Sequence, residues 1–104
     1  MIKVLVKVHH YQNSSVLAIC DPDLLGKEVR DGKRCLKIRE KFYAGILTDV
    51  EDALQLLKSH DNINLIGTVV EKAVEKGLVH KDAVLWLNDR ISGKKIGHVL
   101  IMRV

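Results

Sequence analysis

The sequence is poor in the residue types that mark linkers, disulfide scaffolds and membrane spans. Its 104 residues include one proline, two cysteines and four aromatic side chains. No low-complexity tract interrupts the chain, and its length fits one domain. No apolar run approaches the roughly 20 residues that cross a bilayer, and the N-terminal segment alternates charged and aliphatic residues instead of forming a signal-peptide block. We therefore expect a single domain over residues 1–104, cytoplasmic and without a membrane partner.

The cysteines and glycines give no sign of a metal or phosphate site. Cys20 and Cys35 could form at most one disulfide, which a reducing cytosol disfavours, so we expect two free thiols. Metal-ligand spacings such as CxxC or HxxxH are absent, and Gly93 lacks the upstream glycine of a P-loop. The sequence therefore predicts no metal site and no cofactor.

What the sequence does contain is a concentration of positive charge in residues 27–45. This stretch holds seven basic and three acidic side chains, a surplus of four that equals the net charge of the whole chain, +4. Asp31-Gly32 is a typical two-residue hairpin turn, because both residue types tolerate a positive φ. We therefore expect residues 27–30 and 33–39 to pair as antiparallel strands.

One face of this hairpin is the first candidate for a binding site. Strand alternation puts Lys33, Lys37 and Arg39 on one face, with Lys41 just beyond and an aromatic pair that includes Tyr43 directly after it. Cations attract phosphates, and flat rings stack on unpaired bases. These five residues therefore predict binding to RNA or a ribonucleoprotein. The alternative is a solvated edge strand whose lysines prevent aggregation, with the aromatic pair anchored in the core.

Hydrophobic periodicity predicts two strands in the first part of the chain. Residues 2–8 alternate aliphatic and polar positions as a half-buried strand does, whereas residues 16–20 are apolar throughout, as expected for a central strand. Asp21-Pro22 then predicts a short helical turn, with the aspartate as its N-cap and the proline at its first helical position.

The second half of the chain predicts two consecutive helices and a terminal hairpin. Apolar residues at helical spacing indicate helices over 49–59 and 63–76, the second of which would end at Gly77. Residues 83–87 and 96–104 are strand-like and are joined by a polar loop. The order of strands, two helices and strands favours an α+β fold, a mostly antiparallel sheet packed against two consecutive helices.

A thiol enzyme is the second candidate function. Cys20 ends the central strand where a helical turn begins, a position at which amide dipoles lower the pKa of a thiol. His98 is then the candidate base, oriented by Asp21 or Asn64. The structural alternative is that Cys20 is buried, Asp21 and Asn64 cap helices, and His98 is a hydrogen-bonded sheet residue. A third candidate is a protein–protein interaction module that uses an exposed edge strand or the helix pair.

Several short patterns also occur in a characteristic order and spacing. They are Cys20-Asp21, Leu24-Leu25-Gly26, Phe42-Tyr43-Ala44-Gly45, Asn64 with Gly67, Gly77, and finally His98. In this combination the chain resembles the archaeal uncharacterised family known as domain of unknown function 424. The resemblance runs almost the full length and implies an archaeal, cytoplasmic, stand-alone small domain, with no established reaction, cofactor or partner. The family's C-terminal motif reads like Pro-His-Ala-Gln, whereas this chain has Gly-His-Val-Leu at 97–100, so no role that needs the proline or glutamine carries over.

Overall fold

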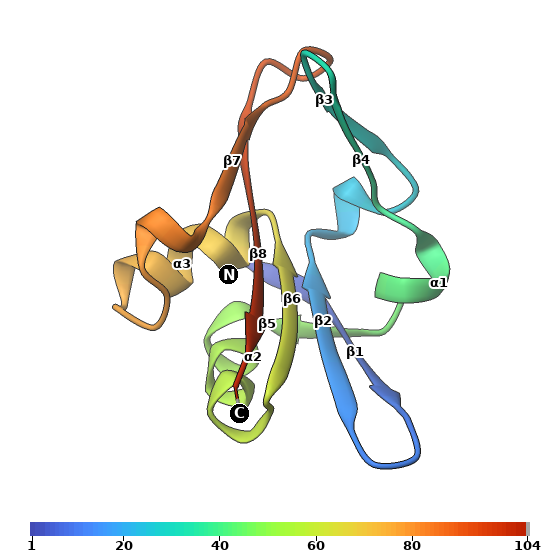
Figure 1. The fold of residues 1–104 in the computed structure, drawn as a ribbon, viewed down its shortest axis with the longest axis vertical. Coiled ribbons are helices and arrows are strands. Elements are labelled where there is room, and N and C mark those ends of the chain that lie inside the picture. The colour runs from blue at the N-terminus through green and yellow to red at the C-terminus, as the bar shows by residue number, and fades with distance from the viewer. Residues whose placement is uncertain (104) are drawn as a thin grey trace.

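The computed structural model describes residues 1–103, whose main element is a six-stranded sheet accompanied by a separate two-stranded hairpin (Figure 1). The strands of the large sheet are β1 (Lys3–His10), β2 (Ser15–Cys20), β5 (Ile46–Asp49), β6 (Asn62–Ile66), β7 (Leu85–Asn88) and β8 (Lys95–Met102). Their spatial order is β5-β1-β2-β6-β8-β7, in which only the β2–β6 pair is parallel. The hairpin is formed by β3 (Glu28–Asp31) and β4 (Arg34–Lys37). The predicted α+β class with a mostly antiparallel sheet is confirmed.

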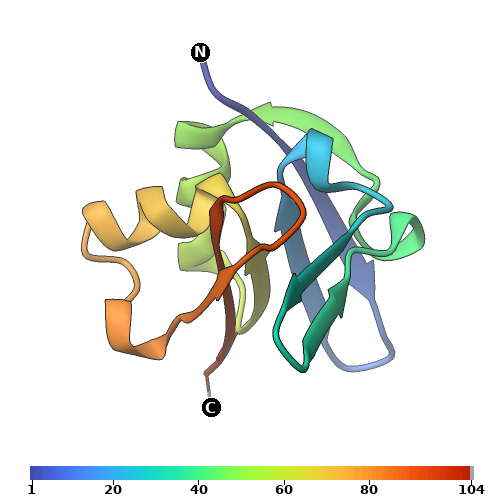
Figure 2. The ribbon, with the colours of Figure 1, turned by 90° about the horizontal axis from the view of Figure 1, so that it is seen from above.

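The helices are short and lie on the two sides of the sheet. They are α1 (Glu40–Tyr43), α2 (Val50–Gln55) and α3 (Thr68–Glu75), with 3₁₀ turns η1 (Pro22–Leu24), η2 (Leu56–Ser59) and η3 (Lys81–Ala83). Figure 2 shows α2 and α3 on one side and the hairpin with α1 on the other. No helix in the described part of the chain is long and apolar enough to cross a membrane.

Alternation along the central strands divides the core into two clusters. Leu17, Ile19 and Leu65 belong to the cluster that α2 and α3 cover. Ala18 and Cys20 point the opposite way and belong to the cluster beneath the hairpin and α1. Because β2 is buried on both faces, it is apolar at nearly every position, as the sequence predicted for residues 16–20.

The second predicted helix begins later than expected. Residues 63–66 lie in β6, and the helix that follows them is α3, which begins at Thr68 and ends before Gly77. The two helices that pack on the sheet are therefore separated by a strand. Ile63 and Leu65 are buried on one face while Asn64 points to the other. This alternation of side chains, with a period of two residues, is that of a strand and not of a helix.

The hairpin turn lies one residue further along than predicted. Asp31 pairs with Arg34, so the two loop residues are Gly32 and Lys33, with φ of 61° at the glycine. A glycine at the first loop position suits the twist of the flanking strands. Lys37 is exposed and Ile38 is 1% exposed, as predicted. Lys33 lies in the turn and Arg39 beyond the end of β4, so strand alternation does not place these two on the face of Lys37.

The remaining sequence predictions of strands are confirmed within a few residues. The opening alternation corresponds to β1, and the terminal hairpin is formed by β7 and β8; residue 104 of the predicted strand 96–104 lies outside the described residues. Gly77 has a φ of 71°, and its N–H donates to the Val74 carbonyl while the Leu78 N–H donates to that of Ala73. This is the left-handed cap that the sequence predicted for the end of the helix.

Candidate functional site

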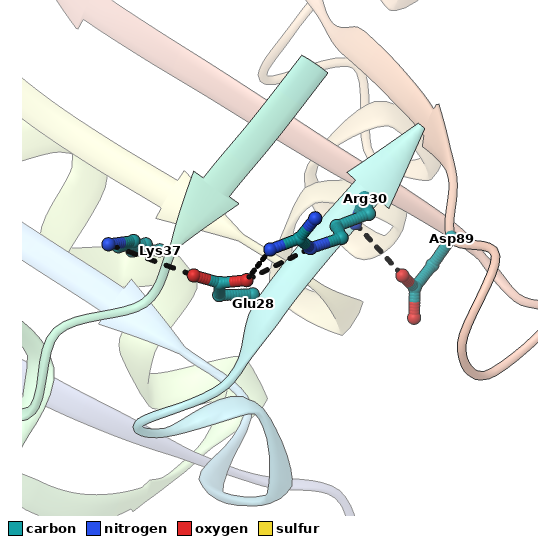
Figure 3. Close-up of polar contacts among 4 residues, drawn as sticks. All are labelled: Glu28, Arg30, Lys37 and Asp89. Atoms are coloured by element: carbon teal, nitrogen blue, oxygen red, sulfur yellow. Dashed lines mark hydrogen bonds and ion pairs between the residues drawn. The ribbon is translucent and has the colours of Figure 1, made fainter. Parts of the chain in front are cut away.

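The outward face of the hairpin β3–β4 carries two cations on either side of one carboxylate (Figure 3). Arg30 donates from Nε and Nη2 to Glu28 Oε2 at 3.0 and 2.9 Å. Lys37 Nζ lies 3.7 Å from the other oxygen of Glu28. The hydrogen bonds and positive charge of Arg30, with a smaller effect of Lys37, hold the pKa of Glu28 below its usual range. The carboxylate is therefore charged and offsets one of the two cations.

Four further cations, without such an offset, lie at the turn and in the segment after β4. Lys33 and Arg34 lie at the turn, and Arg39 and Lys41 follow β4. All four side chains are exposed, and within residues 1–103 none of them forms an ion pair. Of the cations predicted to bind RNA, Lys33, Arg39 and Lys41 are thus unpaired, and Lys37 is shared with Glu28.

The hairpin is fixed to the rest of the molecule through β3. The Arg30 N–H donates to Asp89 Oδ1 at 3.0 Å, and the Arg90 N–H donates to the Arg30 carbonyl at 2.9 Å (Figure 3). Asp89 is 6% exposed and also accepts a hydrogen bond from the Ser92 hydroxyl at 2.7 Å, the main cause of its lowered pKa. Among the described strands β4 pairs with β3 alone, so β4 is the edge that meets solvent.

Tyr43 does not have the role predicted for it. The residue is 4% exposed, and its hydroxyl donates to Asn64 Oδ1 at 2.7 Å, so its ring is not available to stack on a base. Burial, and then the neighbouring Cys20, raises the pKa of Tyr43 to about 12. Phe42 stacks instead on His9, with ring centroids 4.7 Å apart. The aromatic pair therefore anchors α1 on the sheet, as the structural alternative proposed.

The predicted thiol site is not assembled. Cys20 is fully buried, and burial, followed by the charges of Asp21 and Asp23, raises its pKa to about 12. The strand register places Cys20 opposite Ile66, which in turn lies opposite His98. The thiol and the imidazole are therefore separated by a strand and an isoleucine side chain. A protonated, buried thiol without an adjacent base is not a nucleophile.

Asp21 caps a helix, although not the one that follows it in sequence. Its Oδ2 accepts hydrogen bonds from the backbone N–H and the hydroxyl of Thr68, both at 2.9 Å, and so caps α3. It makes no side-chain cap bond to η1. Burial raises the pKa of Asp21 in spite of these hydrogen bonds. Because β2 and β6 are parallel, their ends meet at one edge of the sheet, which brings Asp21 to the start of α3.

Asn64 and His98 are two residues of the predicted thiol site that the fold brings into contact. Asn64 lies in β6 and not at a helix start, and its Oδ1 accepts from the Tyr43 hydroxyl at 2.7 Å and from His98 Nε2 at 3.0 Å. Burial lowers the pKa of His98, so its ring is neutral at pH 7. Sequence reasoning missed the part of Tyr43 in this cluster. The alternation of asparagine with aliphatic residues over 62–66 was the signal that could have placed Asn64 in a strand.

Comparison with known proteins yields two matches. The family model described as "Protein of unknown function (DUF424)" matches residues 9–98, a range that contains every residue of the sequence resemblance. The crystal structure of an uncharacterized conserved protein from Methanopyrus kandleri is similar to this chain, with a TM-score of 0.71 and 29% sequence identity over 98% of this chain and 95% of that one. No curated protein matches the chain. Neither description assigns an activity.

Proposed function

We propose that this chain, which belongs to the DUF424 family, is a small archaeal cytoplasmic protein that binds RNA, free or within a ribonucleoprotein, through the hairpin β3–β4 and the segment after it. The observation that carries the proposal is the set of exposed, unpaired cations at the turn of the hairpin, at the start of β4 and in the segment after it. They are Lys33, Arg34, Arg39 and Lys41. Lys37 adds to them, although Glu28 offsets part of its charge. The two free cysteines are in keeping with a reducing cytoplasm.

Several unpaired cations in one short segment suit a phosphate backbone. Each phosphate that a lysine or arginine neutralises releases condensed counterions, which drives binding and makes it depend on salt. An ordinary solvated edge strand has the same composition, because lysines also prevent edge-to-edge association. RNA binding and a solvated edge predict different results. Only RNA binding at the hairpin makes the affinity for RNA depend on salt and fall more when a cation is removed from the hairpin than from elsewhere.

The test is the affinity for a labelled single-stranded RNA across a salt series, measured by fluorescence anisotropy. The variant Lys33→Gln, Arg39→Gln removes two cations from the hairpin and the segment after it. The variant Lys58→Gln, Lys81→Gln is the matched control, since both lysines are exposed, lie in η2 and η3, and form no ion pair within the described residues. The two variants have the same net charge.

We expect the salt slope of log affinity to fall by about 1.4 in the hairpin variant, at about 0.7 for each phosphate contact of a single strand. The control should keep the wild-type slope. Equal losses in both variants would mean that net charge alone attracts RNA. A wild-type protein that binds no RNA at low salt would leave the hairpin cations as a solvated edge.

A further inference from the structure

On the side of the sheet that carries the hairpin and α1, part of the sheet is covered by neither of them. Six side chains on the side of the sheet opposite α2 and α3 form a surface that we call the uncovered sheet face. They are Asn62, Asn64, Leu85, His98, Leu100 and Met102. Leu85, Leu100 and Met102 are 41%, 64% and 81% exposed, and the two asparagines and the histidine are half-buried. Three polar and three apolar side chains thus meet solvent together.

The polar groups of this face have a fixed orientation. Asn64 Oδ1 already accepts two hydrogen bonds, from the Tyr43 hydroxyl and from His98 Nε2. Its Nδ2 donates to no group of the described chain. Because this nitrogen is also absent from the buried, unpartnered atoms of the described residues, it is free to donate to a ligand. His98 must carry its proton on Nε2, because Oδ1 only accepts, and its Nδ1 is therefore a free acceptor. The face presents an amide donor beside an imidazole acceptor.

Exposed leucines lie next to both polar groups. The strand register places Leu100 opposite Asn64 and Leu85 opposite His98. Apolar and aromatic side chains form the surface on which an extruded base packs, while nearby polar groups read its edge. A donor, an acceptor and an apolar platform side by side match the chemistry of one nucleobase.

One cation, Arg34, borders the uncovered sheet face. A groove of about 310 Å³, lined by Arg34, Cys35 and Leu36 of β4 and by Leu85 and Leu87 of β7, joins the face to the hairpin. None of the described residues of β6, β7 or β8 is acidic. Arg34 in the groove, together with the lack of carboxylates on these strands, therefore favours an anionic partner over a neutral or basic one.

We infer that the uncovered sheet face reads a base of single-stranded RNA, with Asn64 Nδ2 donating to an acceptor on the base edge and His98 Nδ1 accepting from a donor beside it. The inference rests on the proposed function, which supplies the phosphate contacts. Phosphate contacts position a nucleic acid and base contacts give sequence preference. A single strand is required, because the bases of an RNA duplex are paired and its major groove is too narrow for side chains.

The test compares the affinities for three labelled oligonucleotides, oligo(A), oligo(C) and oligo(U), each measured across a salt series. Asn64→Asp keeps an oxygen that accepts from Tyr43 and His98, and replaces the free amide donor with an acceptor. Its added negative charge weakens binding to every RNA, so the quantity measured is the ratio between the best and the worst base. Leu100→Ser is a second variant at a position that is 64% exposed and so leaves the fold intact.

We expect wild type to prefer one base by about tenfold, as a good base-edge contact does. Asn64→Asp should change that ratio, and Leu100→Ser should weaken binding without changing the salt slope. Lys33→Gln, Arg39→Gln should weaken all three oligonucleotides alike and keep the ratio. Suppose that wild type binds in a salt-dependent way with equal affinity for the three oligonucleotides, and that neither Asn64→Asp nor Leu100→Ser alters this binding. That result would overturn this inference alone. Absence of any binding by wild type would overturn the proposed function as well.

Discussion

Single residues in this chain make contacts that their neighbours in the sequence do not indicate. Asp21 matches the N-cap of the turn that follows it, yet its carboxylate caps α3 through Thr68. Tyr43 stands in an exposed basic segment, yet its hydroxyl is bound to Asn64 beneath α1. The residue type predicted the cap at Asp21, whereas the anchoring of Tyr43 was only the alternative to its predicted stacking on RNA bases. The partner depends on which strands lie side by side, and one sequence does not specify that pairing.

Gly67, which joins β6 to α3, gives a prediction at this scale. Its φ is 95°, and a Cβ built there would lie 2.4 Å from Asp21 Oδ2. We expect Gly67→Ala to lower the free energy of unfolding by about 3 kcal/mol, because strained backbone and a steric clash add.

Gly93→Ala is the matched control for this substitution, measured alongside it by urea denaturation. Gly93 also has a positive φ, 72°, but nothing lies within 4 Å of a Cβ there. It should cost about 1 kcal/mol. Equal destabilisation of the two variants would contradict the close approach of Asp21 to the β6–α3 junction.

At the scale of elements, periodicity predicted most of the fold and failed where two periods overlap. The alternation that predicts β1 fits no helix, so that strand was placed correctly. Residues 63–66 read Ile-Asn-Leu-Ile, a pattern that suits one side of a helix and also a strand. These residues form a strand because they pair in parallel with β2. A parallel partner is far away in the sequence, so the local pattern does not reveal it. The contact between Asn64 and His98 could not be predicted for the same reason, because residues 63–66 were predicted as a helix and form β6.

The attachment of the hairpin through Asp89 gives a prediction about an element. Asp89→Ala removes the acceptor of the Arg30 N–H and of the Ser92 hydroxyl. We expect the amides of residues 28–37 to exchange with deuterium faster in this variant, while those of β1 and β2 keep their protection. Asp82→Ala, at a side chain that is 79% exposed, is the control and should leave the hairpin unchanged. Unaltered exchange over 28–37 in Asp89→Ala would show that the hairpin is held by other contacts.

On the scale of the whole molecule, the sheet separates two surfaces of different character. One side carries α2 and α3, and the other carries the hairpin, α1 and the uncovered sheet face (Figures 1 and 2). The sequence alone located the surplus of positive charge in residues 27–45. It did not indicate that these cations lie on the same side of the sheet as Asn64 and His98, because that depends on the course of the chain.

The central claim is that RNA binds on the hairpin side, and an NMR titration tests it most directly. The backbone amide shifts of the ¹⁵N-labelled protein would be followed as a short single-stranded RNA is added at low salt. We expect shift changes in β4, in the turn at Gly32-Lys33, in α1 and around Asn64 and Leu100, with little change in α2 and α3. Changes concentrated on α2 and α3, or no changes at any RNA concentration, would contradict the account.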